Sequence, residues 1–286
     1  MKNSVSNIMT KAVYTINTED GVGKAGRIMD EKDIDSLPVY DNGRLVGIIT
    51  SKDIRKTHPN RIVADAMTSE IVSIAPEASI WEAHKVLEQN NIGRLLVLDD
   101  GNLVGIITRA TLSAELGKHI DQLTGLYKSE YINHQIFELL VRGMEVSLIL
   151  IDLDRFGFID KVHGHVIGDI ILKEVSDILV ENAPEEAQIC RYGGDEFVII
   201  TPFDIDKCKE LAENLLDIIS AHVFYSGISI SASAGITKGA LAKSTQNTPL
   251  NFVKTLINTA SLASTRAKNE NSRIIVDENT FVTEIA

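Results

Sequence analysis

The amino-acid sequence contains an internal repeat, and this repeat constrains the fold more than any other feature. Residues 8–54 and 66–112 align without gaps at an offset of 58 residues, and 16 of the 47 aligned positions are identical. The longest identical stretch covers residues 45–50, which return as residues 103–108. Such self-similarity at a fixed offset indicates a duplicated structural unit.

Each copy predicts the same order of elements. An extended segment (residues 13–16 or 71–74) precedes an amphipathic helix, which begins after Thr18-Glu19 or Pro76-Glu77. Two short strands then flank Asp-Asn-Gly or Asp-Asp-Gly, residues that tolerate positive φ and favour a hairpin turn, and a final helix follows.

The charge is unevenly distributed along the chain. The 286 residues carry a net charge of −12, which repels nucleic-acid backbones and anionic membranes, so neither is expected as a partner. Residues 1–118 contribute −2 and residues 119–286 contribute −10. A length of this size favours two domains. A negatively charged substrate of the second half therefore needs a local cation.

The cysteine content and the hydropathy indicate the compartment. Two cysteines, Cys190 and Cys208, are too few for a disulfide framework or a cysteine-rich metal site. The sequence shows no signal peptide at its start, and its longest apolar run is far shorter than the roughly 20 residues that span a membrane. We expect a cytoplasmic protein.

The two copies resemble a tandem pair of cystathionine β-synthase (CBS) domains. That family's ligand-binding pattern is complete in the first copy as Gly-Ile-Ile-Thr-Ser-Lys-Asp at residues 47–53, whereas in the second copy, at residues 105–111, Thr111 replaces the aspartate. The resemblance implies that an adenosine nucleotide binds the pair, with regulatory-ligand residues Thr50, Asp53, Thr108 and Arg109. Asp53 would accept hydrogen bonds from the ribose hydroxyls. The alternative is that Thr50 and Asp53 only cap a helix and the pair serves packing or dimerisation.

A short apolar stripe connects the two halves. Leu112, Leu116, Ile120 and Leu123 follow at helical spacing, which predicts one helix leading from the first half into the second. We therefore expect CBS repeats over residues 1–58 and 59–115, a helical connector over 116–124, and a second domain over 121–286.

Carboxylates follow or interrupt the β-rich runs of the second half. Residues 147–154 predict a buried strand that ends in the carboxylates Asp152 and Asp154, and residues 189–200 predict a hairpin with Asp195 and Glu196 at its tip. If these ends meet, the carboxylates require a divalent cation, and hard cations with all-oxygen ligands suit phosphates. Two-metal phosphoryl or nucleotidyl transfer is the chemistry this pattern favours.

These segments together resemble the GGDEF domain of bacterial diguanylate cyclases. The resemblance rests on Asp-Gln-Leu-Thr-Gly-Leu at 121–126, the region 151–169, Gly-Gly-Asp-Glu-Phe at 193–197, the strand 229–236 and Ala267-Lys268. It implies an α+β fold in which helices flank a central antiparallel sheet, like polymerase palm and adenylyl cyclase domains. It further implies a homodimer in which two GTP molecules become cyclic di-GMP and pyrophosphate, with Mg²⁺ or Mn²⁺ as cofactor.

The same resemblance implies roles for individual residues. Asp152, the Leu153 carbonyl and Asp195 would hold Mg²⁺, and Asp195 and Glu196 would be catalytic. The substrate-binding residues would be Asp160, His165, Asp169, Lys268 and Arg273.

Several positions depart from the family pattern. Gly157 replaces the usual lysine, Asp160 replaces a guanine-contacting asparagine, and Arg273 lies one position beyond the usual phosphate arginine. No Arg-x-x-Asp product-inhibition motif precedes the Gly-Gly pair. Two hypotheses follow: a diguanylate cyclase regulated by an adenosine-type ligand, or a weak or inactive GGDEF domain that acts as a nucleotide-sensing binding protein.

Overall fold

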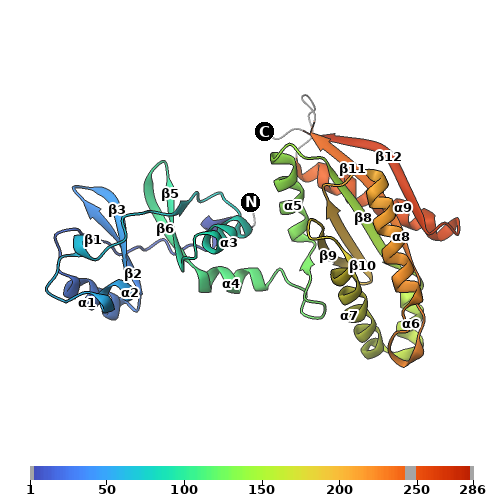
Figure 1. Cartoon of the computed structure of the whole chain (residues 1–286), viewed down its shortest axis with the longest axis horizontal. Coiled ribbons are helices and arrows are strands. Elements are labelled where there is room, and N and C mark those ends of the chain that lie inside the picture. Colours follow the sequence, from blue (N-terminus) through green and yellow to red (C-terminus); the bar gives the residue numbers. More distant parts are fainter. Residues whose placement is uncertain (1–2, 242–248, 284–286) are drawn as a thin grey trace. The chain divides into compact units, whose positions relative to one another are not determined.

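The chain divides into two compact units, Met1–Lys118 and His119–Ala286 (Figure 1). The computed structural model describes residues 3–241 and 249–283. Short 3-10 turns lie at Val5–Asn7, Val63–Asp65 and Tyr225–Gly227.

The first unit contains two three-stranded sheets, ordered β1-β2-β3 and β4-β5-β6. In each sheet the first strand joins in parallel and the other two form an antiparallel hairpin. The elements of the first repeat are β1 (Ile16–Asn17), α1 (Val22–Lys32), β2 (Ser36–Asp41), β3 (Arg44–Thr50) and α2 (Ser51–Lys56). Those of the second are β4 (Ser73–Ile74), α3 (Ile80–Gln89), β5 (Arg94–Asp99), β6 (Asn102–Thr108) and α4 (Arg109–Gly117).

The predicted hairpin turns are confirmed. Asn42 and Gly43 have φ of 47° and 79°, and Asp100 and Gly101 have φ of 47° and 81°. Two successive residues with positive φ match the twist of antiparallel strands, which explains why Asn, Asp and Gly occupy both turns.

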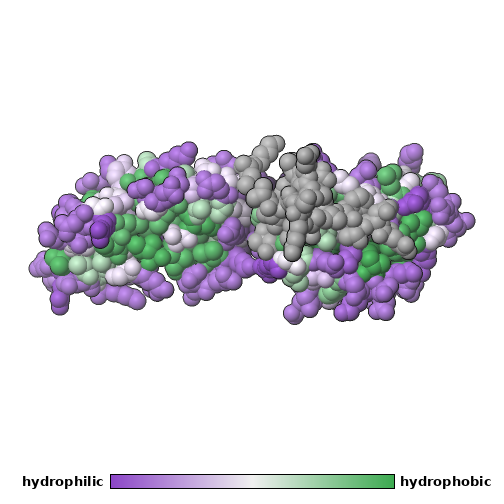
Figure 2. Space-filling view, turned by 90° about the horizontal axis from the view of Figure 1, so that it is seen from above, coloured by the Kyte–Doolittle hydropathy of each residue, from purple (hydrophilic) through white to green (hydrophobic). Residues whose placement is uncertain are grey.

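A segment of each repeat forms a β-bridge with a strand of the other repeat. Thr10 of the first repeat forms a β-bridge with Ile106 of the second, and Thr68 of the second forms one with Ile48 of the first. These four positions map onto one another at the 58-residue offset, so the repeats are related by a pseudo-twofold operation. Figure 2 shows a continuous apolar area, bordered by polar residues, on the first unit.

The second unit is built on a six-stranded sheet ordered β12-β11-β8-β10-β9-β7. The four inner strands are antiparallel, whereas β12 and β7 join the edges in parallel. This confirms the predicted central antiparallel sheet. The strands are β7 (Tyr127–Lys128), β8 (Val146–Leu153), β9 (Gln188–Gly193), β10 (Glu196–Thr201), β11 (Ala232–Leu241) and β12 (Ile274–Thr283). The helices are α5 (Glu130–Val141), α6 (Phe156–His163), α7 (His165–Asn182), α8 (Ile205–Ala221) and α9 (Pro249–Asn269).

Helices cover both faces of this sheet. Ala234 and Ile236 of β11 belong to the buried core formed with α7 and α8. Gly235 points to the other face, where α9 lies so close that a Cβ would collide with the Ala260 carbonyl. Alternation along β11 thus separates an α7–α8 layer from a layer that contains α9 and α5.

The predicted continuous helix through Leu123 is wrong. Helix α4 ends at Gly117, and Ile120 forms a β-bridge with Tyr127. The Asp121 N–H donates to the Leu126 carbonyl at 2.8 Å, so this segment closes a turn instead of continuing a helix. Among the helices of the described residues, none is long and apolar enough to cross a membrane.

Candidate functional site

Two strand ends bring three carboxylates together in the second unit. Glu196 of β10 lies opposite Asp152 of β8 in the antiparallel register. The Leu153 N–H donates to the Asp195 carbonyl at 3.3 Å, which fixes the β9–β10 turn beside the end of β8. The juxtaposition expected from the sequence is therefore present.

Burial and mutual repulsion make this cluster costly to ionise. Burial raises the pKa of Asp152, and the charges of Asp195 and Asp154 raise it further, while Lys268 opposes them. Burial also raises the pKa of Glu196, and Asp152 and Asp195 add to that rise. A cation placed among these groups would relieve the repulsion.

One ammonium group already contacts the oxygen atoms expected to bind the metal. Lys268 Nζ of α9 lies 2.7 Å from Asp152 Oδ1 and 3.8 Å from Asp154 Oδ1. It also donates to the Leu153 carbonyl at 3.1 Å. The family resemblance implied that Lys268 binds substrate, whereas here its ammonium neutralises the carboxylates.

The donor set fits a hard divalent cation. The Asp152 and Leu153 oxygen atoms converge on one cationic position, and such oxygen ligands suit Mg²⁺ or Mn²⁺. No group of three His, Cys, Asp or Glu side chains in metal-binding geometry occurs among the described residues. The remaining ligands would come from phosphate oxygens and water, the usual arrangement for Mg²⁺ with nucleotides.

Asp154, the second carboxylate that the sequence places at the end of this strand, lies at the same edge, and no role was expected for it. Asp154 accepts hydrogen bonds from the hydroxyls of Ser231 at 2.6 Å and Ser233 at 2.9 Å, and its N–H donates to the Ser231 carbonyl at 2.8 Å. The two serines are spaced by two, as on one face of a strand, and that spacing was the available signal. They hold Asp154 beside Lys268.

The residues expected at the base pocket lie on α6 and α7. Asp160 Oδ2 pairs with His165 Nδ1 at 3.1 Å. Gly168 leaves room for this carboxylate, because a Cβ there would collide with it. Asp169 is exposed on α7. Asp160 thus has a partner within the protein in His165.

Arg273 has a different partner from the one the sequence suggested. Its Nη1 lies 2.6 Å from Asp217 Oδ1 on α8. Within the described part of the chain, no contact joins Arg273 to the carboxylate cluster.

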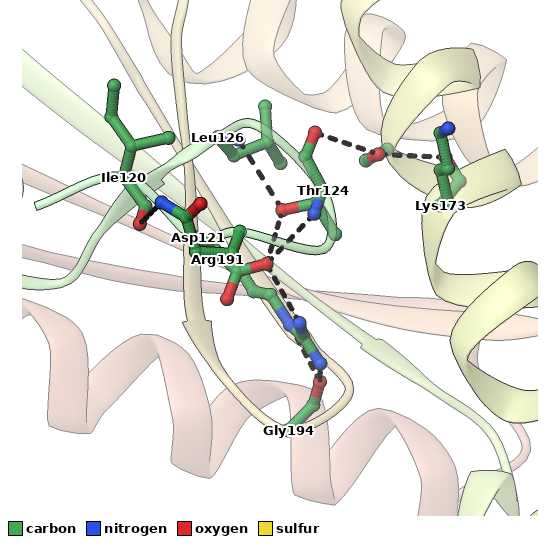
Figure 3. Close-up of polar contacts among 9 residues, drawn as sticks. Ile120, Asp121, Thr124, Leu126, Lys173, Arg191 and Gly194 are labelled. Atoms are coloured by element: carbon green, nitrogen blue, oxygen red, sulfur yellow. Dashed lines mark hydrogen bonds and ion pairs between the residues drawn. The ribbon is translucent and has the colours of Figure 1, made fainter. Parts of the chain in front are cut away.

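An arginine links the opening motif of the second unit to the Gly-Gly turn (Figure 3). Arg191 Nη1 donates to Asp121 Oδ1 at 2.9 Å, while its Nε and Nη2 donate to the Gly194 carbonyl at 3.1 and 2.8 Å. Asp121 Oδ1 also accepts from the N–H and hydroxyl of Thr124 at 3.0 and 2.8 Å. The turn that carries Asp195 is therefore tied to residues just after the unit boundary.

The charge of Asp121 is stabilised by this arrangement. Burial raises the pKa of its carboxyl, but the hydrogen bonds from Arg191 and Thr124 outweigh burial, and the net pKa is lowered. No role was expected for Arg191 from the sequence. A charged residue on an otherwise apolar run, directly before Tyr-Gly-Gly, was the signal.

The CBS residues occupy two different settings. Asp53 Oδ2 accepts from the N–H and hydroxyl of Thr50 at 2.9 and 2.6 Å, and Thr50 caps α2 in return. Thr108 caps α4 in the same way. Thr108 and Arg109 also line a cavity of about 750 Å³, whereas Thr50 and Asp53 do not. Capping is therefore observed in both repeats, and the open cavity lies on the side of the incomplete motif.

Comparison with known protein families agrees with these two units. The family described as "Diguanylate cyclase, GGDEF domain" matches residues 118–273. The CBS domain family matches twice, over residues 5–59 and 63–118. The chain belongs to the GGDEF family and carries a tandem CBS pair before that domain.

Individual proteins of both families are similar to this chain. The chain is 34% identical over 119 residues to diguanylate cyclase DgcS of Shewanella oneidensis, covering 40% of each protein. It is 33% identical over 116 residues to the CBS domain-containing protein YhcV of Bacillus subtilis, covering 38% of this chain and 83% of YhcV. The chain thus spans less than half the length of DgcS.

A solved structure supports the fold. The coiled coil and GGDEF domain of DgcB from Caulobacter crescentus, in complex with c-di-GMP, has a TM-score of 0.51 at 16% identity. The match covers 69% of this chain and 97% of that one.

Proposed function

We propose that this protein is a diguanylate cyclase that joins two GTP molecules into cyclic di-GMP and releases two pyrophosphates. The observation that carries the proposal is the convergence of Asp152, Asp195 and Glu196, two of them with raised pKa, around a position that already attracts a cation. Family membership and the similarity to DgcS support it.

The residues of the cluster would share the work of catalysis. Asp152, the Leu153 carbonyl and Asp195 would hold Mg²⁺ or Mn²⁺, which supplies charge stabilisation at the triphosphate when bound. A 3′-hydroxyl oxygen then forms a bond to the α-phosphorus of the other GTP, and the bond from that phosphorus to pyrophosphate breaks. Asp195 is the proton acceptor, and Glu196, whose pKa is raised by burial, completes the acidic cluster.

Lys268 must change partner in this scheme. With a divalent cation held by Asp152, the ammonium of Lys268 would be free to meet the triphosphate, a substrate-binding role of the kind that the family resemblance implies. Asp169 would accept from the guanine N1–H and amino group, with Asp160 and His165 alongside.

Two copies are required, because each 3′-hydroxyl attacks the partner's nucleotide. We therefore propose a homodimer. The continuous apolar area on the first unit is consistent with association, since contiguous apolar patches mark interaction sites (Figure 2).

The CBS pair would regulate the rate through a bound adenosine-type ligand. Helix α4 starts at Arg109, which lines the cavity, and ends at Gly117, two residues before the second unit begins in the sequence. Asp121, a few residues further on, holds Arg191 and through it the turn that carries Asp195. A ligand that binds two arrangements of α4 unequally would thus bias the catalytic turn.

A second function is favoured by specific contacts. Lys268, Asp160 and Arg273 are each engaged by another side chain of the protein. Together with Gly157 in place of lysine, this favours weak GTP binding and a regulatory role without turnover.

The proposal is tested by incubating the full chain with GTP and Mg²⁺ or Mn²⁺ and separating the products. We expect cyclic di-GMP from the wild type, a loss of about 100-fold or more for Asp195→Ala, and no change for Asp206→Ala, an exposed carboxylate on α8. Wild-type rates in Asp195→Ala would overturn the assignment. GTP binding without turnover would establish the second function.

A further inference from the structure

One cavity of the CBS pair lies between the two repeats, beside the incomplete motif of the second. Its lining combines Tyr14 and residues 33–36 of the first repeat with Ile106, Thr108 and Arg109 of the second. A volume of about 750 Å³ lies within the range of small-molecule sites. Every lining residue lies in the first unit.

The repeat operation relates one lining residue of this cavity to a very different side chain. Ser36 is buried in the cavity lining, and its counterpart at the 58-residue offset is Arg94. Arg94 reaches across to the first repeat, donating from Nη1 to the Asp35 carbonyl at 2.8 Å and from Nη2 to Asp35 Oδ2 at 2.7 Å. A long cationic side chain of the second repeat thus corresponds to the small hydroxyl that lines the cavity in the first.

The cationic groups at the cavity are engaged within the protein. Arg109 forms an ion pair with Glu88 through Nη1 and donates from Nη2 to the Ile92 carbonyl at 2.8 Å. Arg94 follows the lining residue Gly93 but is not itself part of the lining, and it is held by Asp35. Lys32 lies over the Tyr14 ring, 5.2 Å from its centre, and is not part of the lining.

The start of α4 offers little to an anion. The Arg109 N–H donates to the Gly93 carbonyl at 2.8 Å, and the Thr111 N–H donates to the Thr108 hydroxyl. Two of the first three amide groups that attract phosphate at a helix N-terminus are therefore satisfied. Asp33, an exposed carboxylate of the lining, has no ion pair among the described residues.

We propose that this cavity binds a nucleoside-sized ligand that is neutral or positively charged, and that it excludes ligands bearing phosphate. Tyr14, Ile34 and Ile106 offer an aromatic and apolar surface to a flat base, and the hydroxyls of Ser36 and Thr108 offer polar contacts to a sugar. The proposal rests on the regulatory part of the proposed function and replaces the expected nucleotide at Asp53 with a phosphate-free ligand at Thr108.

The test is a calorimetric comparison of three matched compounds with the full chain. Adenosine, 5′-amino-5′-deoxyadenosine and AMP share the base and sugar and differ mainly in the charge at the 5′ position. We expect adenosine to bind at least 10-fold more tightly than AMP, and the amine to bind at least as tightly as adenosine.

Two variants separate the charges that set this order. Asp33→Asn should reduce the preference for the amine over adenosine several-fold, whereas Asp30→Asn, an exposed position on α1, should not. Asparagine tolerates the left-handed conformation of residue 33, whose φ is 51°. Glu88→Gln should raise AMP affinity several-fold without changing adenosine affinity, because it frees Arg109.

Two results would overturn the proposal: AMP binding as tightly as adenosine to the wild type, or no binding of any of the three compounds at millimolar concentration. Neither bears on cyclic di-GMP synthesis, which is measured with GTP alone. Failure here is thus distinguishable from failure of the cyclase assignment.

Discussion

The link between Asp121, Arg191 and the Gly194 carbonyl leads to a stability prediction. Arg191→Met keeps the aliphatic stem but removes one hydrogen bond to a carboxylate and two to a carbonyl. The side chains of Arg191 and Asp121 are only 16% and 21% exposed, so water replaces the lost partner incompletely. The second unit should therefore be destabilised.

The magnitude follows from the number and kind of these bonds. A charge-assisted hydrogen bond contributes about 1.5–3 kcal/mol, and breaking a fully buried ion pair costs about 3–5 kcal/mol. Partial exposure and the remaining bonds from Thr124 reduce the loss at Asp121. We expect a loss of about 2–3 kcal/mol, or about 4–12 °C in Tm for a unit of this size.

The assay uses the position of the single tryptophan. Trp81 lies in the first unit, so its fluorescence reports unfolding of that unit, whereas far-UV circular dichroism reports both. Arg191→Met should shift the dichroism transition of the second unit and leave the fluorescence transition in place. The control is Arg142→Met, which removes an exposed pair with Glu138 at 3.1 Å and should cost about 0.5 kcal/mol or less.

Two results would refute this reasoning. If Arg191→Met and Arg142→Met shift the dichroism transition equally, the Asp121–Arg191–Gly194 link does not stabilise the turn. If the fluorescence transition moves as far as the dichroism transition, the two units do not unfold separately.

Three further predictions concern the sheet edge and the pocket. The folded state raises the pKa of Glu196, so the ionised carboxylate destabilises the folded protein at neutral pH. Glu196→Gln should therefore increase stability to urea at pH 7, and this gain should vanish below pH 4.5, the ordinary pKa of a glutamate, where the carboxyl is protonated in both states. An equal gain at both pH values would contradict this. Gly235→Ala should lower the free energy of unfolding in urea by about 3 kcal/mol or more, because the added Cβ would collide with the Ala260 carbonyl. Its control Gly157→Ala, where the added Cβ meets open space on α6, should stabilise the protein by up to about 1 kcal/mol. Similar effects of the two substitutions would refute the packing of α9. The double substitution Gly157→Lys and Asp160→Asn should tighten GTP binding, measured by calorimetry, about 10-fold or more, because it restores a phosphate contact and removes the pairing of Asp160 with His165. An unchanged affinity would show that other residues weaken GTP binding.

Local patterns predicted much of the fold. The duplicated segments gave the two hairpins of the first unit, because Asn42-Gly43 and Asp100-Gly101 define their own turn geometry. The apolar runs around Asp152 and Gly193-Gly194 gave β8, β9 and β10, since buried strands require continuous apolar sequence.

Features that depend on distant partners could not be predicted. Four apolar residues at helical spacing suggested a helix through Leu123, but the bridge between Ile120 and Tyr127 overrides that periodicity. Lys268 meets Leu153 across 115 positions of sequence, and no local pattern encodes that contact. Arg94 of the second repeat likewise reaches Asp35 of the first across 59 positions, and no local pattern predicts that contact.

The most direct test of the cyclase assignment is the stoichiometry of GTP turnover by the full chain, followed by ³¹P NMR with Mg²⁺ in one tube. The carboxylate cluster of Asp152, Asp195 and Glu196 predicts one pyrophosphate for each GTP consumed and one cyclic di-GMP for every two, with no signal in Asp195→Ala. Release of orthophosphate and GDP, or no consumption of GTP at saturating concentration, would contradict the account.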